Sequence, residues 1–183
     1  MNAFESVIAS LLEHEGFWTK LNYKVELTKD DKKNINRPSS PRWEIDVIGY
    51  QPQTNILRVV ECKSFLDSGG VKLISFDRGI SANTQHLKLF KLFNEDKLRE
   101  IVFDRLSSQL VDKKLCNSSP KIELWLAAGK IYQQDVEPIK KLFSEKGWFL
   151  WTPEDIRERT EKLVNSGYDD STVTIVSKLL KKK

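Results

Sequence analysis

Cysteine and histidine are scarce in this chain, which contains two of each. Cys62 lies in an apolar segment and Cys116 near an expected loop, and together with His14 and His86 they form no spacing typical of a metal site. We therefore expect neither a structural zinc centre nor a disulfide framework.

A long hydrophobic run is missing as well. No apolar stretch approaches the roughly 20 residues of a membrane-spanning helix, and the opening residues, MNAFE, lack the basic-then-apolar order of a signal peptide. We therefore expect a cytoplasmic protein without a membrane partner. Its 39% hydrophobic and 31% charged residues are typical of a soluble globular chain, and its net charge of +4 is too small to identify a partner by itself.

The first part of the chain predicts a helix and then a strand. Apolar residues recur at helical spacing from Phe4 to Leu12, with Asn2 as the N-cap and Gly16 as the C-terminal stop. From residue 17 to residue 27 apolar and polar residues alternate, which is typical of a strand with one wet face. The polar stretch 28–42 contains two prolines and is expected to be a loop.

The rest of the chain alternates between strands and helices. Residues 43–50 and 56–63 are expected to form a hairpin, and residues 64–80 an irregular segment. The remaining expected elements are two helical stretches over 82–111, a strand over 122–128, a helix over 135–146, a strand over 148–151, a helix opening at 152–155 and a last short helix capped by Asp170. This order predicts a single α/β domain over residues 1–183, with a core over about 3–130 and an α/β extension of that core over about 131–183.

Charged residues interrupt the second strand of the expected hairpin. Glu61 and Lys63 share one face with Leu57 and Val59, and the other face of the strand is apolar too. Because unpaired charges in a buried strand cost several kcal/mol each, we expect an oppositely charged partner or a metal ion beside them. If the hairpin loop holds an even number of residues, Asp46 on the first strand emerges on the same side of the sheet.

This arrangement predicts a cation site. Two neighbouring carboxylates repel each other, and a hard divalent cation such as Mg²⁺, or Mn²⁺ in its place, removes that repulsion. Lys63 could then position and acidify an attacking water or stabilise charge on a phosphate, a combination that suits phosphodiester hydrolysis. The alternative interpretation of Asp46, Glu61 and Lys63 is a solvent-facing ion-pair ladder, which would stabilise the sheet by a few tenths of a kcal/mol per pair.

The pattern resembles the core of the PD-(D/E)xK nuclease superfamily, especially Mrr-like restriction endonucleases and archaeal-type Holliday-junction resolvases. The resemblance spans roughly residues 4–63 and rests on Asp46, on Glu61-Cys62-Lys63 and on the preceding helix. It implies a restriction-endonuclease-like mixed β-sheet flanked by helices on both faces, with Asp46 and Glu61 binding Mg²⁺ and Lys63 serving catalysis. It also implies the backbone carbonyl of Cys62 as a further metal ligand and products that carry a 5′-phosphate.

Relatives in these families place a glutamate on the first helix near the metal, and Glu5 matches it by position. Asn2 and Glu5 also form a capping-box pattern, in which Glu5 would only bond to the Asn2 amide, so both interpretations stay open. The proline that usually precedes the aspartate is replaced by Ile45, and Glu44 shares the face of Asp46, either as an additional ligand or beside a basic neighbour.

Other side chains near the expected site are candidates for substrate contacts. Arg42, Lys72 and Arg78 lie in flanking loops and could touch phosphates, although loop cations are usually only solvated. Gln85 in the following helical stretch matches a glutamine that some relatives place near the site.

The sequence thus predicts a metal-dependent endodeoxyribonuclease acting in restriction, defence or repair, with DNA as partner. One active site per chain favours a homodimer for double-strand cleavage, and a methylase or motor partner is an open question. The alternatives are a non-cleaving DNA- or partner-binding module with a nuclease-like fold, and a nuclease acting on RNA or on a branched junction.

Overall fold

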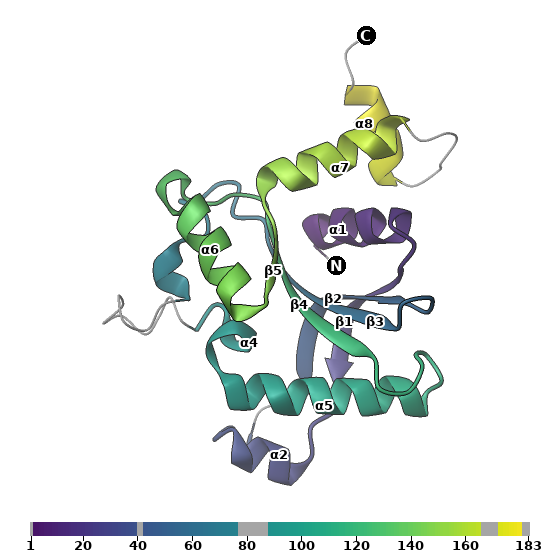
Figure 1. Cartoon of the computed structure of the whole chain (residues 1–183), viewed down its shortest axis with the longest axis vertical. Helices are drawn as coiled ribbons and strands as arrows, with labels where there is room; N and C mark the ends of the chain where they lie inside the picture. Colours follow the sequence, from purple (N-terminus) through teal and green to yellow (C-terminus); the bar gives the residue numbers. More distant parts are fainter. Residues whose placement is uncertain (1, 40–41, 77–87, 166–171, 181–183) are drawn as a thin grey trace.

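The computed structural model describes residues 2–39, 42–76, 88–165 and 172–180. Five strands form one open mixed sheet in the order β1-β2-β3-β4-β5. Strands β1, β2 and β3 are antiparallel neighbours, whereas β3, β4 and β5 run parallel (Figure 1). The strands are β1 (Trp18–Val25), β2 (Trp43–Gln51), β3 (Ile56–Lys63), β4 (Lys121–Ala128) and β5 (Phe149–Trp151).

Helices cover both faces of this sheet, as Figure 1 shows for α1 on one side and α5 on the other. The α-helices of the described residues are α1 (Ala3–His14), α2 (Lys29–Asn34), α4 (Lys91–Asn94), α5 (Asp96–Asp112), α6 (Val136–Lys146), α7 (Pro153–Asn165) and α8 (Thr172–Leu180), with short 3-10 turns η1 (Leu73–Ser75) and η2 (Gln133–Asp135). The predicted α/β class and the mixed sheet between helical layers are confirmed.

Two hydrophobic clusters fill the spaces between the layers. The cluster that we call the α5-side core contains the buried residues of α5 and the phenylalanines that precede it, together with Leu57 and Val59 of β3. The other, the α1-side core, joins α1 and α7 to Val60 and Cys62 of β3. Strand β3 is therefore packed on both faces up to its charged end, as its sequence predicts, and Arg58 is the one charged residue before Glu61.

The pattern of β1 departs from the prediction of one wet face. Leu21 packs against the α1-side core, whereas Tyr23 and Val25 belong to the α5-side core, although all three have the same parity. Asn22 lies between them with a left-handed backbone (φ 50°), which rotates the residues that follow it. The strand therefore reverses its faces at Asn22, and the prediction of strict alternation is wrong there.

The segment 28–42 was expected to be a loop and contains the helix α2 instead. Thr28 accepts a hydrogen bond from the Asp31 amide, and the Asp31 carboxylate accepts one from the Thr28 amide, so a capping box opens this helix. Arg105 on α5 forms an ion pair of 2.7 Å with Asp31. The cap and this distant partner outweigh the low intrinsic helix preference of a polar six-residue segment.

Most predicted boundaries agree with the structure. Asn2 caps α1, Gly16 follows it with φ 85°, and Gly147 ends α6 with φ 67°. Two helical stretches were expected over 82–111, and residues 82–87 of that range lie outside the described residues. The predicted cap of the last helix, Asp170, lies outside them as well. Within the described residues, no helix is long and apolar enough to cross a membrane.

Candidate active site

The candidate site lies at the carboxyl end of β3, where the antiparallel half of the sheet meets the parallel half. The carboxyl ends of parallel strands are where open α/β sheets usually bind ligands. Glu61 and Lys63 are near the end of this strand, and β4 ends beside it at Ala128.

Asp46 reaches β3 from the neighbouring strand. The hairpin pairs Gln51 with Ile56 and Val47 with Val60, so Asp46 lies one step beyond, opposite Glu61. Its Oδ2 atom accepts a hydrogen bond of 2.8 Å from the backbone N–H of Cys62. This bond holds the Asp46 carboxylate against β3.

Glu61 and Lys63 form a close ion pair. Lys63 Nζ lies 2.6 Å from Glu61 Oε1, and the two side chains are only 22% and 18% exposed. Lys63 Nζ also lies 5.9 Å from the ring centroid of Phe90 in the α5-side core. Burial alone would lower the pKa of Lys63, but the Glu61 carboxylate outweighs it and the pKa is raised, so Lys63 is an ammonium at neutral pH.

Negative charge is in excess around Asp46. Burial, and then the carboxylate of Glu61, raise the pKa of Asp46 to about 6 from its ordinary value of 3.8. Glu5 raises this pKa further, while the Cys62 N–H and the Lys63 ammonium lower it. Because burial and neighbouring carboxylates disfavour the ionised form of Asp46, a cation beside it would be stabilising.

Glu5 belongs to the same electrostatic neighbourhood and also caps α1. Its Oε2 atom accepts from the backbone N–H of Asn2 at 3.4 Å and from the side-chain amide of Asn22 at 3.2 Å. The capping interpretation of Glu5 is therefore confirmed, and its side chain is buried, with 8% exposed. A catalytic role for Glu5 stays a prediction.

Cys62 contributes its backbone to the site and its thiol to the core. Burial, and then the nearby carboxylates, raise the pKa of the thiol, so it is neutral and packs in the α1-side core. The carbonyl of Cys62 as a metal ligand stays a prediction. Across the described residues, no three His, Cys, Asp or Glu side chains gather in a group that could hold a metal ion.

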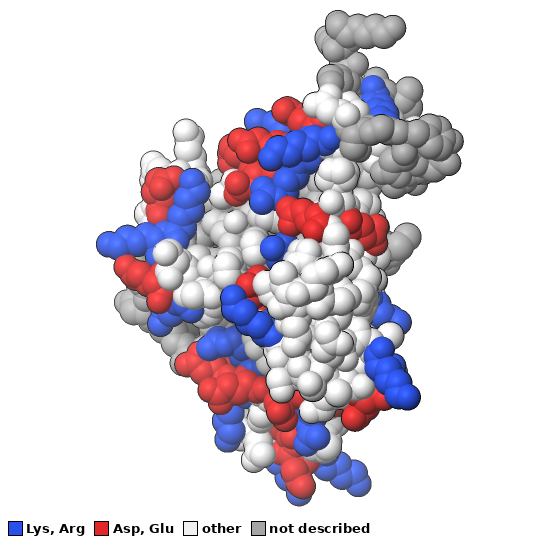
Figure 2. All heavy atoms as spheres, turned by 45° about the vertical axis from the view of Figure 1, so that its right-hand side comes forward, with Lys and Arg blue, Asp and Glu red and all other residues white. Residues whose placement is uncertain are grey.

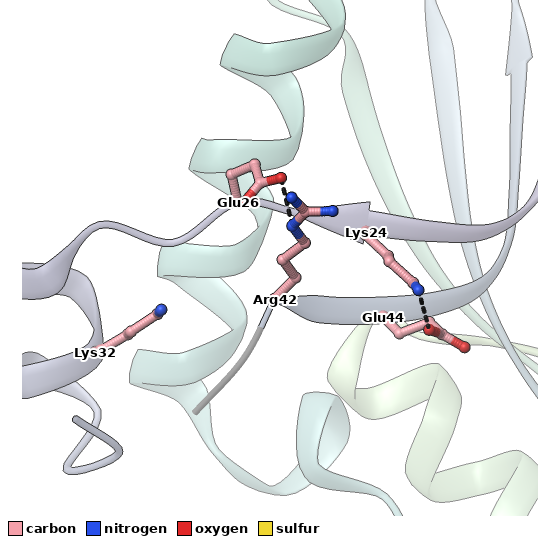
Figure 3. A pocket seen from close by; sticks show the side chains of 5 residues that line it. All are labelled: Lys24, Glu26, Lys32, Arg42 and Glu44. Carbon is pink, nitrogen blue, oxygen red and sulfur yellow. Dashed lines mark ion pairs between the residues drawn. The ribbon is translucent and has the colours of Figure 1, made fainter. Parts of the chain in front are cut away.

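Glu44 and Arg42 are paired with other residues. Figure 3 shows them in a separate hollow where β1 ends and β2 begins, with Lys32 pointing into it. Glu44 pairs with Lys24 at 3.8 Å and Arg42 with Glu26 at 2.6 Å. Glu44 thus meets a basic neighbour, the second of the two expected interpretations. Arg78 and Gln85 lie outside the described residues.

Sequence reasoning missed Asn22 as a member of the site. It lies opposite Asp46, between the pairs Leu21–Val47 and Tyr23–Ile45, and its amide binds Glu5. The available signal was an asparagine in the middle of an alternating strand, because asparagine is the non-glycine residue that best tolerates a left-handed backbone.

Comparison with protein-family models, with curated proteins and with solved structures finds no match for this chain. The resemblance to the PD-(D/E)xK superfamily therefore stays a prediction from Asp46, Glu61, Cys62 and Lys63, and the geometry of the site carries the functional argument.

Proposed function

We propose that this protein is a Mg²⁺-dependent endonuclease that hydrolyses phosphodiester bonds of DNA. The observation that carries the proposal is the half-buried Asp46 carboxylate, which is held beside Glu61 with its pKa raised to about 6 and has Lys63 next to it. In such a site the carboxylates favour binding of a cation, and the fixed positive charge of the lysine can face a phosphate.

The donor set fits Mg²⁺ better than a metal that needs three or four protein ligands. Mg²⁺ prefers oxygen ligands and is usually bound by one or two carboxylates plus water. Asp46 and Glu61 would hold it, with the Cys62 carbonyl as the third ligand that the resemblance implies. When bound, the cation would polarise the phosphate and acidify water.

The chain's own residues supply the rest of the chemistry. The Lys63 ammonium can donate hydrogen bonds to a phosphate oxygen or to the attacking water, and because it is protonated it acts as an electrostatic group rather than a base. Glu5 adds negative charge near the cation from α1. Its position is fixed by Asn2 and Asn22.

Metal dependence is the direct test of this function. Purified protein should nick supercoiled plasmid DNA in Mg²⁺ or Mn²⁺ and lose this activity in EDTA. Asp46→Asn should bind neither ion in calorimetry and should not cut. Because bound metal must displace the Asp46 proton, Mg²⁺ affinity of the unaltered protein should fall about tenfold between pH 7.5 and pH 5. No nicking of any DNA with either ion would contradict the proposal.

The stability of Asp46→Asn serves as the control for folding. A carboxyl whose pKa is higher in the folded chain contributes stability below its unfolded pKa of about 4, and that contribution is lost as the pH rises through 6. At pH 8 in EDTA the ionised Asp46 therefore destabilises the fold, and Asp46→Asn should melt at the same temperature or higher. A lower melting temperature of Asp46→Asn at pH 8 would mean that neighbouring groups compensate the charge of the Asp46 carboxylate.

Exchanging Glu5 separates its two roles. Glu5→Gln can still accept from Asn2 and Asn22, so the free energy of unfolding should change by less than about 0.5 kcal/mol. The lost charge should weaken Mg²⁺ binding by about tenfold, the lower end of the range for residues that support metal ligands. Glu5→Ala should also cost about 1 kcal/mol of stability. Unchanged Mg²⁺ binding by Glu5→Gln would leave Glu5 with its capping role alone.

A DNA- or partner-binding module that does not cut is the second candidate. The lack of a three-member ligand group among the described residues favours it. It predicts nucleic-acid binding without any Mg²⁺ binding that depends on Asp46, and the same calorimetry decides between the two.

A further inference from the structure

Two loops meet directly beside the candidate site. The N–H of Val71 donates to the carbonyl of Lys130, and the N–H of Tyr132 donates to the carbonyl of Val71, both at 2.9 Å. Gly129, next to Lys130, donates its N–H to the carbonyl of Lys63 at 2.8 Å. The loop after β3 and the loop after β4 are thus joined to each other and to the end of the strand that carries Lys63.

This junction leaves large apolar side chains in contact with solvent. Tyr132 is 41% exposed and Leu66 is 63% exposed. In the part of the chain that the structure describes, Tyr132 is the one aromatic ring among the exposed large hydrophobic residues. The other aromatic rings of the sheet pack in the two cores or against neighbouring rings, as Trp125 does on Phe149. An exposed tyrosine at the edge of a candidate active site therefore needs an explanation other than core packing.

Two lysines lie at this junction. Lys72 Nζ lies 5.5 Å from the centroid of Tyr132, and Lys130 Nζ lies 3.5 Å from the backbone oxygen of Leu66. Both lysines are exposed. We call Leu66, Lys72, Lys130 and Tyr132 the loop platform. Proteins bind single strands with an aromatic ring and nearby cations, because a base stacks on the ring and the phosphates contact the charges.

Two glycines let the loops of the platform approach each other closely. Gly70 has a left-handed backbone (φ 83°), and a Cβ atom there would lie 3.0 Å from the backbone of Ile131 and Tyr132. At Gly129 a Cβ atom would lie 2.5 Å from the carbonyl oxygen of Ser64. Both glycines permit contacts between the loops that a side chain would prevent. A surface that is ordered before binding loses less entropy when a ligand binds.

The face of the molecule that Figure 2 displays carries no broad basic patch among the described residues. Figure 2 shows Lys and Arg interspersed with Asp and Glu around a large uncharged area on the face that it displays. With a net charge of only +4, nucleic-acid binding is expected to depend on a few local contacts rather than on a general positive field.

We propose that the loop platform binds unpaired nucleotides of DNA next to the phosphate that is cut, with one base stacked on Tyr132 and phosphates contacted by Lys72 and Lys130. This inference rests on the proposed nuclease function and gives that nuclease DNA with unpaired nucleotides as its substrate class. Duplex DNA keeps its bases stacked within the helix and offers none to the ring, so the site favours single strands, flaps or open junctions over continuous duplex.

Binding in EDTA tests the platform without cleavage. Fluorescence anisotropy with a labelled single-stranded oligonucleotide should show that Tyr132→Ala weakens binding roughly 5- to 150-fold, the range for loss of one base stack, while Tyr132→Phe stays within about twofold. Affinity for a blunt duplex of the same sequence should change by less than about twofold. Replacing both Lys72 and Lys130 by alanine should reduce the slope of log K against log salt by about 1.4, since each single-strand phosphate contact contributes about 0.7.

A matched control lies at the other end of β4. Lys114 and Leu115 are an exposed lysine and a 38% exposed leucine in the loop before this strand, whose eight residues span about 26 Å. Alanine at both positions should leave single-strand binding unchanged. Single-strand affinity that does not respond to Tyr132→Ala, or a duplex affinity that falls equally, would overturn the platform. Platform-dependent binding without any cleavage in Mg²⁺ would overturn the nuclease function instead.

Discussion

Replacing Lys63 by alanine should lower the rate of DNA cleavage at least a hundredfold while the protein stays folded. Among the residues that the structure describes, Lys63 is the one cation in direct contact with a site carboxylate, at 2.6 Å from Glu61. Removal of a single preorganised charge or donor at a transferring group typically costs about 10²–10³ in rate. The loss should appear in kcat for plasmid nicking at saturating Mg²⁺, because the group acts on the developing charge rather than on metal binding.

Stability and a second lysine provide the controls for this result. Lys63→Ala leaves the half-buried Glu61 without its ion-pair partner, so this control is measured in Mg²⁺, whose charge would compensate Glu61. The melting temperature should then stay within about 4 °C of the unaltered protein, which corresponds to about 1 kcal/mol. Lys24→Ala removes an exposed lysine–glutamate pair, with Glu44 at 3.8 Å, from the hollow in Figure 3 and should cut at the normal rate. Equal cleavage by Lys63→Ala and the unaltered protein would remove Lys63 from the chemistry.

Replacing Arg58 by alanine should destabilise the fold by about 3 kcal/mol. The Arg58 side chain is 16% exposed and lies between two rings, 4.2 Å from the centroid of Phe17 and 4.4 Å from that of Trp125. It pairs with Glu15 at 2.7 Å and approaches Glu123, itself only 7% exposed, at 3.6 Å. Truncating one member of a buried ion pair leaves an uncompensated charge and typically costs 3–5 kcal/mol. The lower end applies because Lys121 also contacts Glu123 at 3.1 Å.

Urea unfolding of two arginine variants measures this effect. Arg42→Ala removes an ion pair with Glu26 of 2.6 Å, but the two side chains are 59% and 56% exposed, so the expected loss is below about 1 kcal/mol. The difference between the two variants measures how much the burial of Arg58 and its stacking on two rings add to the stability given by an ion pair. A similar loss of unfolding free energy in both variants would show that the buried contacts of Arg58 stabilise the fold no more than an exposed ion pair does.

Local patterns predicted the parts of the fold that depend on neighbouring residues. The helix cap at Asn2, the left-handed stops at Gly16 and Gly147 and the hairpin follow from a few consecutive side chains. The hairpin loop holds an even number of residues, 52–55, as the expected register of β2 and β3 requires.

The features that sequence reasoning missed depend on contacts between distant segments. The helix α2 is secured by Arg105, which lies 74 positions after Asp31, and Asn22 bonds to Glu5 across 17 positions. A strand with one solvent-facing side is expected to contain polar residues such as Asn22. The sequence therefore does not show whether Asn22 belongs to a regular strand or marks a reversal of the strand's faces. Such tertiary contacts override local preference and leave little trace in short patterns.

The central place of β3 has a consequence for how the protein loses function when heated. Glu61 and Lys63 lie on the middle strand of five, and that strand is hydrogen-bonded on both sides and packed on both faces. Amide hydrogens in such strands exchange with solvent only when the whole domain opens, whereas edge strands and terminal helices open separately. Displacement of Glu61 and Lys63 should therefore coincide with cooperative unfolding of the whole domain. Partial melting of α1 or of the edge strand β1 should displace only Glu5 and Asn22.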